Sequence, residues 1–227
     1  MQYDQSHSRF FSVFRTLLKK EIMESGCTVI CHEKKIRTYN YREYMDLMNE
    51  FVSSGATSGK DQSAEKNEAT KMNLVRMNRW NKTIVIPDFL QKYLDNMNHT
   101  QCWTVISEAW CGDSAQIIPA MAKIAEASKG KIQLQVVFRD DNPELMEEHL
   151  TDGNKAIPKL FSRDLNGKNL FEWGPRPSGA VTLMSEWKKN PAGRTKADVL
   201  EQLHIWYAKN KQLEVMQELY HLLSSVS

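Results

Sequence analysis

The chain has 227 residues, which is enough for one well-cored domain with an extension or for two small domains. Apolar residues make up 41% and charged residues 26%, the balance of an ordinary globular protein. The formal charge is only +2, so composition gives no electrostatic reason to expect nucleic acid or a membrane as a partner.

The N-terminal residues and the cysteine content predict a cytoplasmic protein. No apolar stretch reaches the length of a membrane span, and Met1–Lys20 mixes Arg and Lys with Phe and Leu instead of forming the apolar core of a signal peptide. Four cysteines, at 27, 31, 102 and 111, are too few and too scattered for a disulfide-rich secreted scaffold. In a reducing compartment, a cysteine that matters is more often catalytic or redox-active than structural.

The first part of the chain is predicted to be a mostly helical extension, residues 1–71. Residues 8–51 show helical spacing of apolar residues in two pieces, joined by a short β-branched link at 27–31. Residues 53–70 are rich in Ser, Gly, Lys, Glu and Asn and lack large apolar side chains, so we expect a linker there. The boundary to the second part, residues 72–227, is placed near residue 72.

The second part alternates between strands and helices. In chain order the pattern predicts a strand at 83–86, a helix at 87–97, a strand at 102–106, a helix at 114–128, a strand at 132–138, a helix at 143–150, strands at 159–162 and 169–173, and helices around 181–188 and from about 195. Asn166-Gly167 is a strong hairpin signal between the last two strands. Parallel β-α-β units followed by an antiparallel hairpin predict an α/β fold, with a mixed central sheet covered by helices on both faces.

One cysteine lies where a strand gives way to a helix, in Trp110-Cys111-Gly112-Asp113-Ser114. A thiol attacks only as its thiolate, and the free N–H groups and dipole at a helix N-terminus favour the anion. We therefore expect the pKa of Cys111 to be lowered, with the charge of Asp113 opposing this effect. Gly112 permits a tight turn, Trp110 can shield the sulfur, and Ser114 can cap the helix or donate to the thiolate.

These residues resemble the thioredoxin family, whose usual motif is Trp-Cys-Gly-Pro-Cys. Further matching features are Pro119 inside the following helix, the pair Ile157-Pro158, and a final strand that ends at Gly174. The resemblance covers roughly residues 80–210. It implies a three-layer thioredoxin-like fold with a cis Pro158, where the backbone of Ile157 receives an extended substrate as an added strand.

The sequence departs from this family at two positions. Ser114 replaces the second cysteine, which makes the chain a monothiol variant and puts the ordinary dithiol–disulfide cycle in doubt. Val105 stands where many members have a buried Asp that accepts a proton. Glu108 could substitute for that Asp, although an exposed carboxylate at the strand end is the simpler interpretation.

The resulting hypothesis is thiol–disulfide exchange or redox sensing through Cys111, with a protein disulfide or a small thiol such as glutathione as the partner. It requires no cofactor and no metal, and the histidines show no metal-ligand spacing. An alternative is a non-catalytic thioredoxin-fold module that binds partners or acts like a chaperone. A third possibility pairs Cys27 or Cys31 with Cys111, whereas Cys102 is interpreted as a core residue. The sequence does not predict the oligomeric state.

Overall fold

The computed structural model describes residues 27–31 and 34–226. The amphipathic helix predicted within residues 8–26 lies outside this part of the chain. The elements are β1 (Ile30–Cys31), β2 (Lys34–Lys35), β3 (Tyr39–Asn40), α2 (Tyr41–Ser54), α3 (Ala64–Thr83), α4 (Asp88–Asn96), β4 (Gln101–Ser107), α5 (Gly112–Ala127), β5 (Ile132–Phe138), α6 (Pro143–Glu148), β6 (Lys159–Asp164), β7 (Asn169–Trp173), α7 (Ser178–Lys189), α8 (Lys196–Asn210) and α9 (Leu213–Ser225).

The centre of the molecule is a mixed sheet with the strand order β3-β5-β4-β6-β7. Strands β4 and β5 are parallel, with Val105 opposite Val136, and α5 forms the connection between them. Strand β6 runs antiparallel to both β4 and β7, while β3 runs antiparallel to β5. The predicted α/β fold with a mixed sheet between helices is therefore confirmed.

Local sequence signals explain several element boundaries. Asn40 forms a capping box with Glu43 at the start of α2, and Thr195 forms another with Asp198 at the start of α8. Pro143 opens α6, where its missing N–H is not needed. The helix expected from about residue 195 is in fact two helices, because the chain turns at residues 211–212 with positive φ.

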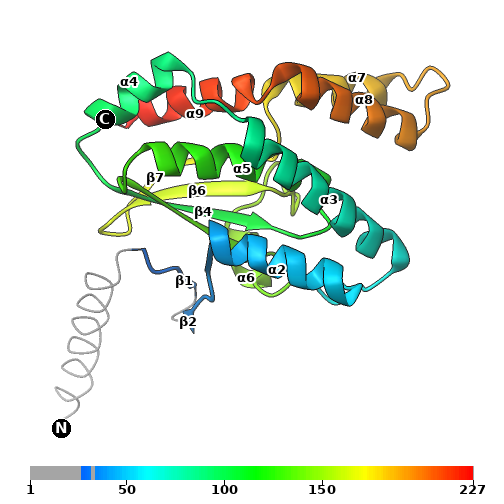
Figure 1. Cartoon of the computed structure of the whole chain (residues 1–227), viewed down its shortest axis with the longest axis horizontal. Coiled ribbons are helices and arrows are strands. Elements are labelled where there is room, and N and C mark those ends of the chain that lie inside the picture. The colour runs from blue at the N-terminus through cyan, green and yellow to red at the C-terminus, as the bar shows by residue number, and fades with distance from the viewer. Residues whose placement is uncertain (1–26, 32–33, 227) are drawn as a thin grey trace, which may run out of the picture.

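The two faces of the sheet are covered differently (Figure 1). In that view α3, α5 and α9 lie above the sheet and α6 lies below it. The apolar cluster of the first face includes Met77, Leu94, Ile117, Val136 and Leu219, which are at most 1% exposed. The cluster of the second face is smaller and is made by α6, the 27–36 segment and the sheet, with these members: Val29, Cys31, Ile106, Cys111, Val137, Leu145, Met146, Ile157 and Phe161.

Two expected elements are wrong. Residues 53–70 do not form a continuous linker, because α2 reaches Ser54, α3 starts at Ala64, and the boundary expected near residue 72 falls inside α3. Polar residues dominate the first turns of α3 because these turns lie near the surface, while its later turns bury Leu74, Met77 and Trp80.

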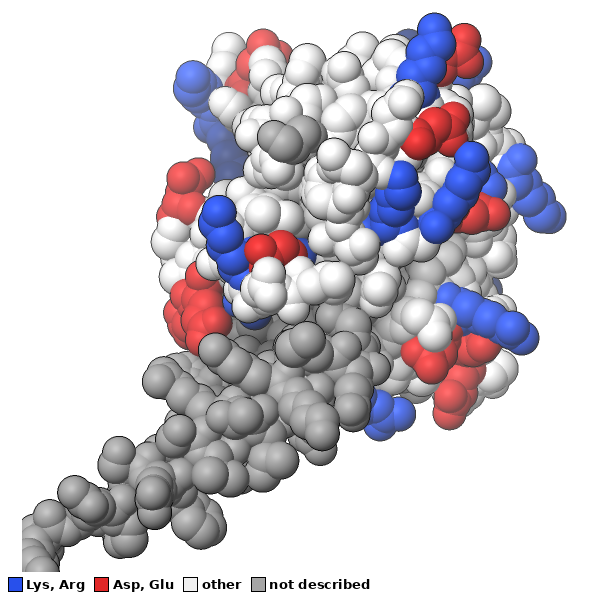
Figure 2. Space-filling view, turned by 90° about the vertical axis from the view of Figure 1, so that its left-hand side faces the viewer, with Lys and Arg blue, Asp and Glu red and all other residues white. Residues whose placement is uncertain are grey.

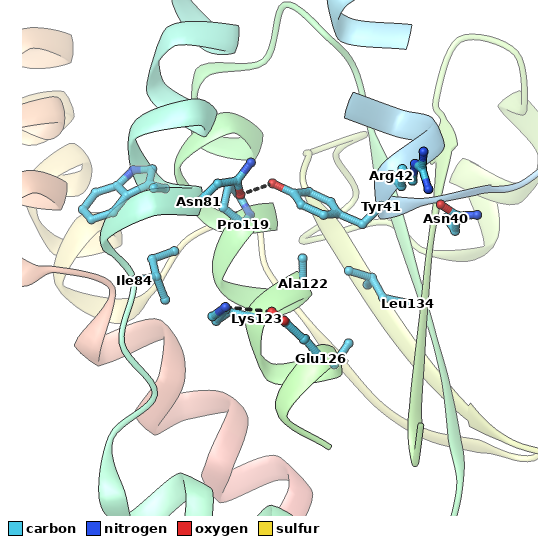
Figure 3. A pocket seen from close by; sticks show the side chains of 12 residues that line it. Asn40, Tyr41, Arg42, Asn81, Ile84, Pro119, Ala122, Lys123, Glu126 and Leu134 are labelled. Carbon is cyan, nitrogen blue, oxygen red and sulfur yellow. Dashed lines mark hydrogen bonds and ion pairs between the residues drawn. The ribbon is translucent and has the colours of Figure 1, made fainter. Parts of the chain in front are cut away.

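Residues 83–86 form no strand, although their β-branched sequence predicted one: Thr83 ends α3, and the residues after it have no regular secondary structure. The β5 edge is occupied instead by β3, from the part of the chain assigned to the extension. Between the start of α2, the end of α3 and α5 lies a cavity of about 450 Å³ (Figure 3). Tyr41 and Asn81 point toward each other beside it and share a hydrogen bond of 2.7 Å.

The interpretation of Cys102 as a core thiol is also incomplete. Cys102 is buried, but its sulfur forms a disulfide with Cys27. This bond ties the 27–36 segment to the first residues of β4 on the second face, where Ile36 N donates to Val29 O at 2.9 Å. A cross-link between residues 75 positions apart leaves no local pattern in the sequence.

Candidate active site at Cys111

Cys111 is the N-cap residue of α5 and follows directly on the loop that leaves β4. Its side chain is 7% exposed, and the thiol donates to the carbonyl oxygen of Ile157 at 3.5 Å. The Ile157–Pro158 peptide bond is cis, as the family resemblance implied. The fold thus brings the predicted reactive residue and the predicted substrate-binding pair together.

Residues at the end of β7 contact the loop that carries Pro158. Gly174 has φ +116, and a Cβ at this position would collide with the carbonyl oxygen of Pro158. The next residue along, Lys159, places its ammonium 2.9 Å from Glu172, which also lies 2.6 Å from the ring of His149. Lys159 and His149 are buried and Glu172 is 38% exposed, so a carboxylate near the surface joins two buried side chains and helps to fix the geometry of this loop.

Burial governs the acidity of Cys111. Burial, followed by the charge of Asp113, raises the pKa of the thiol to about 11. The Ser114 hydroxyl and the backbone N–H groups at the helix start could donate to a thiolate and so act to lower the pKa, but this effect is smaller than that of burial. The expectation of a lowered pKa is therefore wrong. A buried thiolate loses its hydration, and its favourable interaction with the helix N-terminus is too weak to compensate for that loss.

Ser114 has an unusual position beside the thiol. Its side chain is 1% exposed, and its hydroxyl oxygen has no hydrogen-bond partner while Cys111 donates to Ile157. A buried hydroxyl without a partner is costly. A thiolate at Cys111 would give this hydroxyl an acceptor, so Ser114 is placed to stabilise the anion and not to resolve a disulfide.

Two side chains bind the carboxylate of Asp113. Tyr207 on α8 donates to its Oδ1 at 3.0 Å, and Arg176 lies 2.5 Å from its Oδ2. Both partners come from the chain after β7, more than 60 residues away, and nothing in the motif pointed to them. Arg176 compensates much of the negative charge that would otherwise oppose a thiolate.

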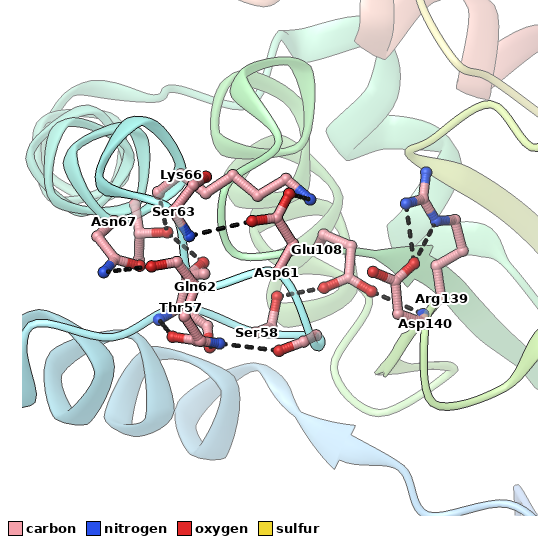
Figure 4. Close-up of polar contacts among 12 residues, drawn as sticks. Thr57, Ser58, Asp61, Gln62, Ser63, Lys66, Asn67, Glu108, Arg139 and Asp140 are labelled. Atoms are coloured by element: carbon pink, nitrogen blue, oxygen red, sulfur yellow. Dashed lines mark hydrogen bonds and ion pairs between the residues drawn. The ribbon is translucent and has the colours of Figure 1, made fainter.

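Glu108 is fully buried, so its interpretation as an exposed strand-end carboxylate is wrong (Figure 4). The hydroxyl of Ser58 donates to one carboxylate oxygen, and the backbone N–H of Asp140 donates to the other at 2.7 Å. Ser58 in turn accepts from the backbone N–H of Ala109 at 2.8 Å. The backbone carbonyl of Glu108 accepts from the backbone N–H of Cys111 at 3.1 Å. Among the described residues, no hydrogen bond joins the Glu108 carboxylate to the Cys111 thiol, so the visible role of this carboxylate is to fix the loop before Trp110.

Trp110 lies under two cations. The ammonium of Lys66 is 4.2 Å from its ring centroid, and the guanidinium of Arg139 is 5.1 Å away. Each cation also has a carboxylate partner, Asp61 for Lys66 and Asp140 for Arg139. Figure 4 shows these pairs on the two sides of Glu108. They hold the tryptophan in place beside the cysteine.

The other cysteines do not join this site. Cys27 is bonded to Cys102, and the thiol of Cys31 donates to a carboxylate oxygen of Glu148 at 3.3 Å. Burial and Glu148 raise the pKa of Cys31 to about 11. Cys31 and Cys111 belong to the same apolar cluster, but no described bond connects them. Within the described ranges, no three His, Cys, Asp or Glu side chains form a metal-ligand group, and no helix is long and apolar enough to cross a membrane.

The sequence matches the model of the thioredoxin family over residues 59–188, which is more than half of the chain. The chain belongs to the thioredoxin family. No curated protein sequence matches this thioredoxin-family chain significantly.

Solved structures resemble this family member in fold. A protein of unknown function from Pseudomonas aeruginosa superimposes with a TM-score of 0.51 at 16% identity, over 83% of this chain and 99% of that chain. An HIV epitope scaffold superimposes with a TM-score of 0.48 at 15% identity, over 83% of this chain and all of the scaffold (100%). At 16% identity, the likeness to the Pseudomonas aeruginosa protein shows a shared fold alone.

Proposed function

We propose that this thioredoxin-family protein carries out thiol–disulfide exchange through the single thiol of Cys111. The observation that supports this most directly is the placement of that thiol at the start of α5, against the carbonyl of Ile157. The unpartnered hydroxyl of Ser114 supports it further, because it is positioned to donate to a thiolate.

The proposed exchange proceeds in one displacement. Cys111 loses its proton to a base in solution, and the thiolate attacks one sulfur of a disulfide RSSR. The bond between Cys111 and that sulfur forms while the S–S bond of the substrate breaks, so that RS⁻ leaves with the electron pair. Since Ser114 cannot act as the resolving group, a second thiol from solution or from a partner must release the mixed disulfide. The partner is a protein disulfide or a small thiol, and the chemistry needs no cofactor.

The high pKa of Cys111 means that the resting thiol is protected. At neutral pH only a small fraction of Cys111 is ionised. Exchange therefore requires the substrate to displace the hydrogen bond from the thiol to Ile157, after which the Ser114 hydroxyl can donate to the thiolate. The compensation of Asp113 by Arg176 keeps the remaining electrostatic opposition low.

Reaction with the neutral disulfide dithiodipyridine tests the proposal. The native protein should release one thiopyridone and carry the mixed disulfide on Cys111, as identified by peptide mass spectrometry. The rate should rise about tenfold per pH unit between neutral pH and about pH 10, as a thiol with a pKa of about 11 requires. The Cys111→Ala variant should lose the reaction, whereas Cys31→Ser should keep it.

A second candidate function is a binding module without redox turnover. The near-complete burial of Cys111 and its raised pKa favour this alternative. If Cys111 reacts only after the protein is unfolded by denaturant, exchange is ruled out and the binding module is the better description.

A further inference from the structure

Helix α3 carries an arginine, Arg76, that has no carboxylate partner among the described residues. Arg76 is partly buried, and among the described residues neither it nor Arg79, one turn further along α3, forms an ion pair. Elsewhere on the surface, Lys and Arg are interspersed with Asp and Glu, as the face in Figure 2 shows. A partly buried guanidinium without an anion is unfavourable unless a ligand supplies one.

Arg76 is held in place relative to the active site. Its Nη1 donates to Oδ1 of Asn73 at 2.8 Å, and Asn73 is fully buried. The amide nitrogen of Asn73 donates in turn to the carbonyl of Ala109 at 2.9 Å, two residues before Cys111. The arginine is therefore fixed to the same loop as the reactive cysteine.

His204 on α8 provides a second donor, close to the residue that follows Cys111. A Cβ on Gly112, the residue after Cys111, would lie 3.5 Å from Cε1 and 4.0 Å from Nε2 of this ring. Burial and the nearby Arg76 lower the pKa of His204 to about 4, so the ring is neutral at neutral pH.

The hydrogen-bond chain fixes which ring nitrogen carries the proton. Nε1 of Trp80 can only donate, and it donates to Oε1 of Gln116 at 2.6 Å. The amide nitrogen of Gln116 therefore faces Nδ1 of His204, at 3.1 Å, and donates to it. The neutral ring must then carry its proton on Nε2, which leaves an N–H donor directed toward the turn at Gly112.

We infer that Arg76 and His204 form a carboxylate-binding site beside Cys111, which selects small acidic disulfides of the glutathione type as substrates. The guanidinium supplies the positive charge and Nε2–H of His204 supplies a neutral hydrogen bond. A small substrate fits the site because Cys111 is only 7% exposed and a folded partner would reach it less readily. The inference rests on the proposed exchange at Cys111 for its biological meaning, but the binding site itself does not need the reaction.

Two disulfide reagents of opposite character test the selectivity. The second-order rate constant at Cys111 is measured with dianionic dithiobis(nitrobenzoate) and with neutral dithiodipyridine, and the ratio of the two is compared between variants. In Arg76→Gln this ratio should fall about tenfold, whereas Arg76→Lys should retain most of it. The matched control is Arg42→Gln, which removes an exposed arginine from α2 and should leave the ratio unchanged. An unchanged ratio in Arg76→Gln would overturn the inference.

Binding of S-methylglutathione, an acidic peptide that cannot exchange, separates this inference from the proposed function. Calorimetry should show binding to the native protein that is about tenfold weaker in Arg76→Gln and that weakens at about 1 M salt. Absence of binding to the native protein overturns the site, whether or not Cys111 reacts. If S-methylglutathione binds but dithiodipyridine does not react with Cys111, the site stands and the exchange function fails.

Discussion

The two faces of the sheet are stabilised in different ways, and Cys111 lies at their junction. The first face is packed by long helices around fully buried apolar side chains such as Ile117. The second face has the short helix α6 and the 27–36 segment, and it depends on a disulfide and on the polar contacts that Lys159 and His149 make with Glu172. Cys111 itself belongs to the cluster of the second face, whereas Ala109 and Ala115 on either side of it belong to the first. Cys111 therefore lies between the first face, which long helices pack, and the second face, which has fewer packed side chains.

The largest expected effect tests this contrast directly. Ile117→Ala on the first face should lower the free energy of unfolding by about 4 kcal/mol, because the long helices around it cannot close the cavity. Leu145→Ala, equally buried on the second face, should cost about 2 kcal/mol because the six-residue helix α6 can shift inward. Chemical denaturation measures both values. Equal losses at the two positions would show that the faces are packed equally well.

Gly174 links the last strand to the Pro158 loop, and its replacement should have the next largest effect. Gly174→Ala should cost about 3 kcal/mol, since a side chain at positive φ is strained and its Cβ collides with Pro158. The reaction of Cys111 with dithiodipyridine should change as well, because Ile157 would shift. Gly130→Ala is the control, as it also has positive φ but no atom within 4 Å of the added Cβ. Similar losses in the two variants would assign the effect to strain alone.

Loss of the Cys27–Cys102 disulfide should have a smaller effect, confined to the second face. Cys27→Ser should lower the free energy of unfolding by about 2 kcal/mol, because the unfolded chain gains conformational entropy when the cross-link is removed. It should also speed the alkylation of Cys31, which the 27–36 segment buries. Native protein treated with dithiothreitol should behave like the variant. If Cys31 alkylation stays the same in both, the disulfide does not hold this segment in place. The state of this bond in cells also tests the predicted cytoplasmic location, where disulfides are rare.

The smallest effect is a pH dependence carried by His204. Its pKa is about 4 in the folded protein and about 6.5 in the unfolded chain, so only the unfolded state gains a proton between these values. Stability should fall as the pH drops from about 6.5 to about 4. His204→Gln should remove about 1 kcal/mol of this fall, allowing for partial solvent screening. His149, whose pKa is also lowered by burial, has the same sign and contributes to the dependence that remains, together with the carboxylate of Glu172, whose pKa is lowered by Lys159 and His149. An identical pH profile in His204→Gln would contradict the assignment.

Much of the central domain could be predicted from the sequence because its signals are local. The apolar runs of β4 and β5, Pro143 at the start of α6, and Asn166-Gly167 in the hairpin each act over a few residues. The position of Cys111 at a helix start follows from the same kind of pattern. The strand expected at 83–86 failed because a β-branched run fits a strand only when a sheet edge is free, and β3 occupies that edge.

The sequence by itself determined the fold class and the family resemblance, and it placed Cys111 at the start of a helix. Only the tertiary structure decided how that cysteine behaves. Its acidity depends on burial and on Asp113, whose partners Arg176 and Tyr207 arrive from a distant part of the chain. The same holds for Arg76 and His204, which come from two different helices: Arg76 is bonded through Asn73 to Ala109, and His204 lies close to Gly112. Electrostatic and desolvation effects depend on distances in space, and the order of residues in the chain does not fix those distances.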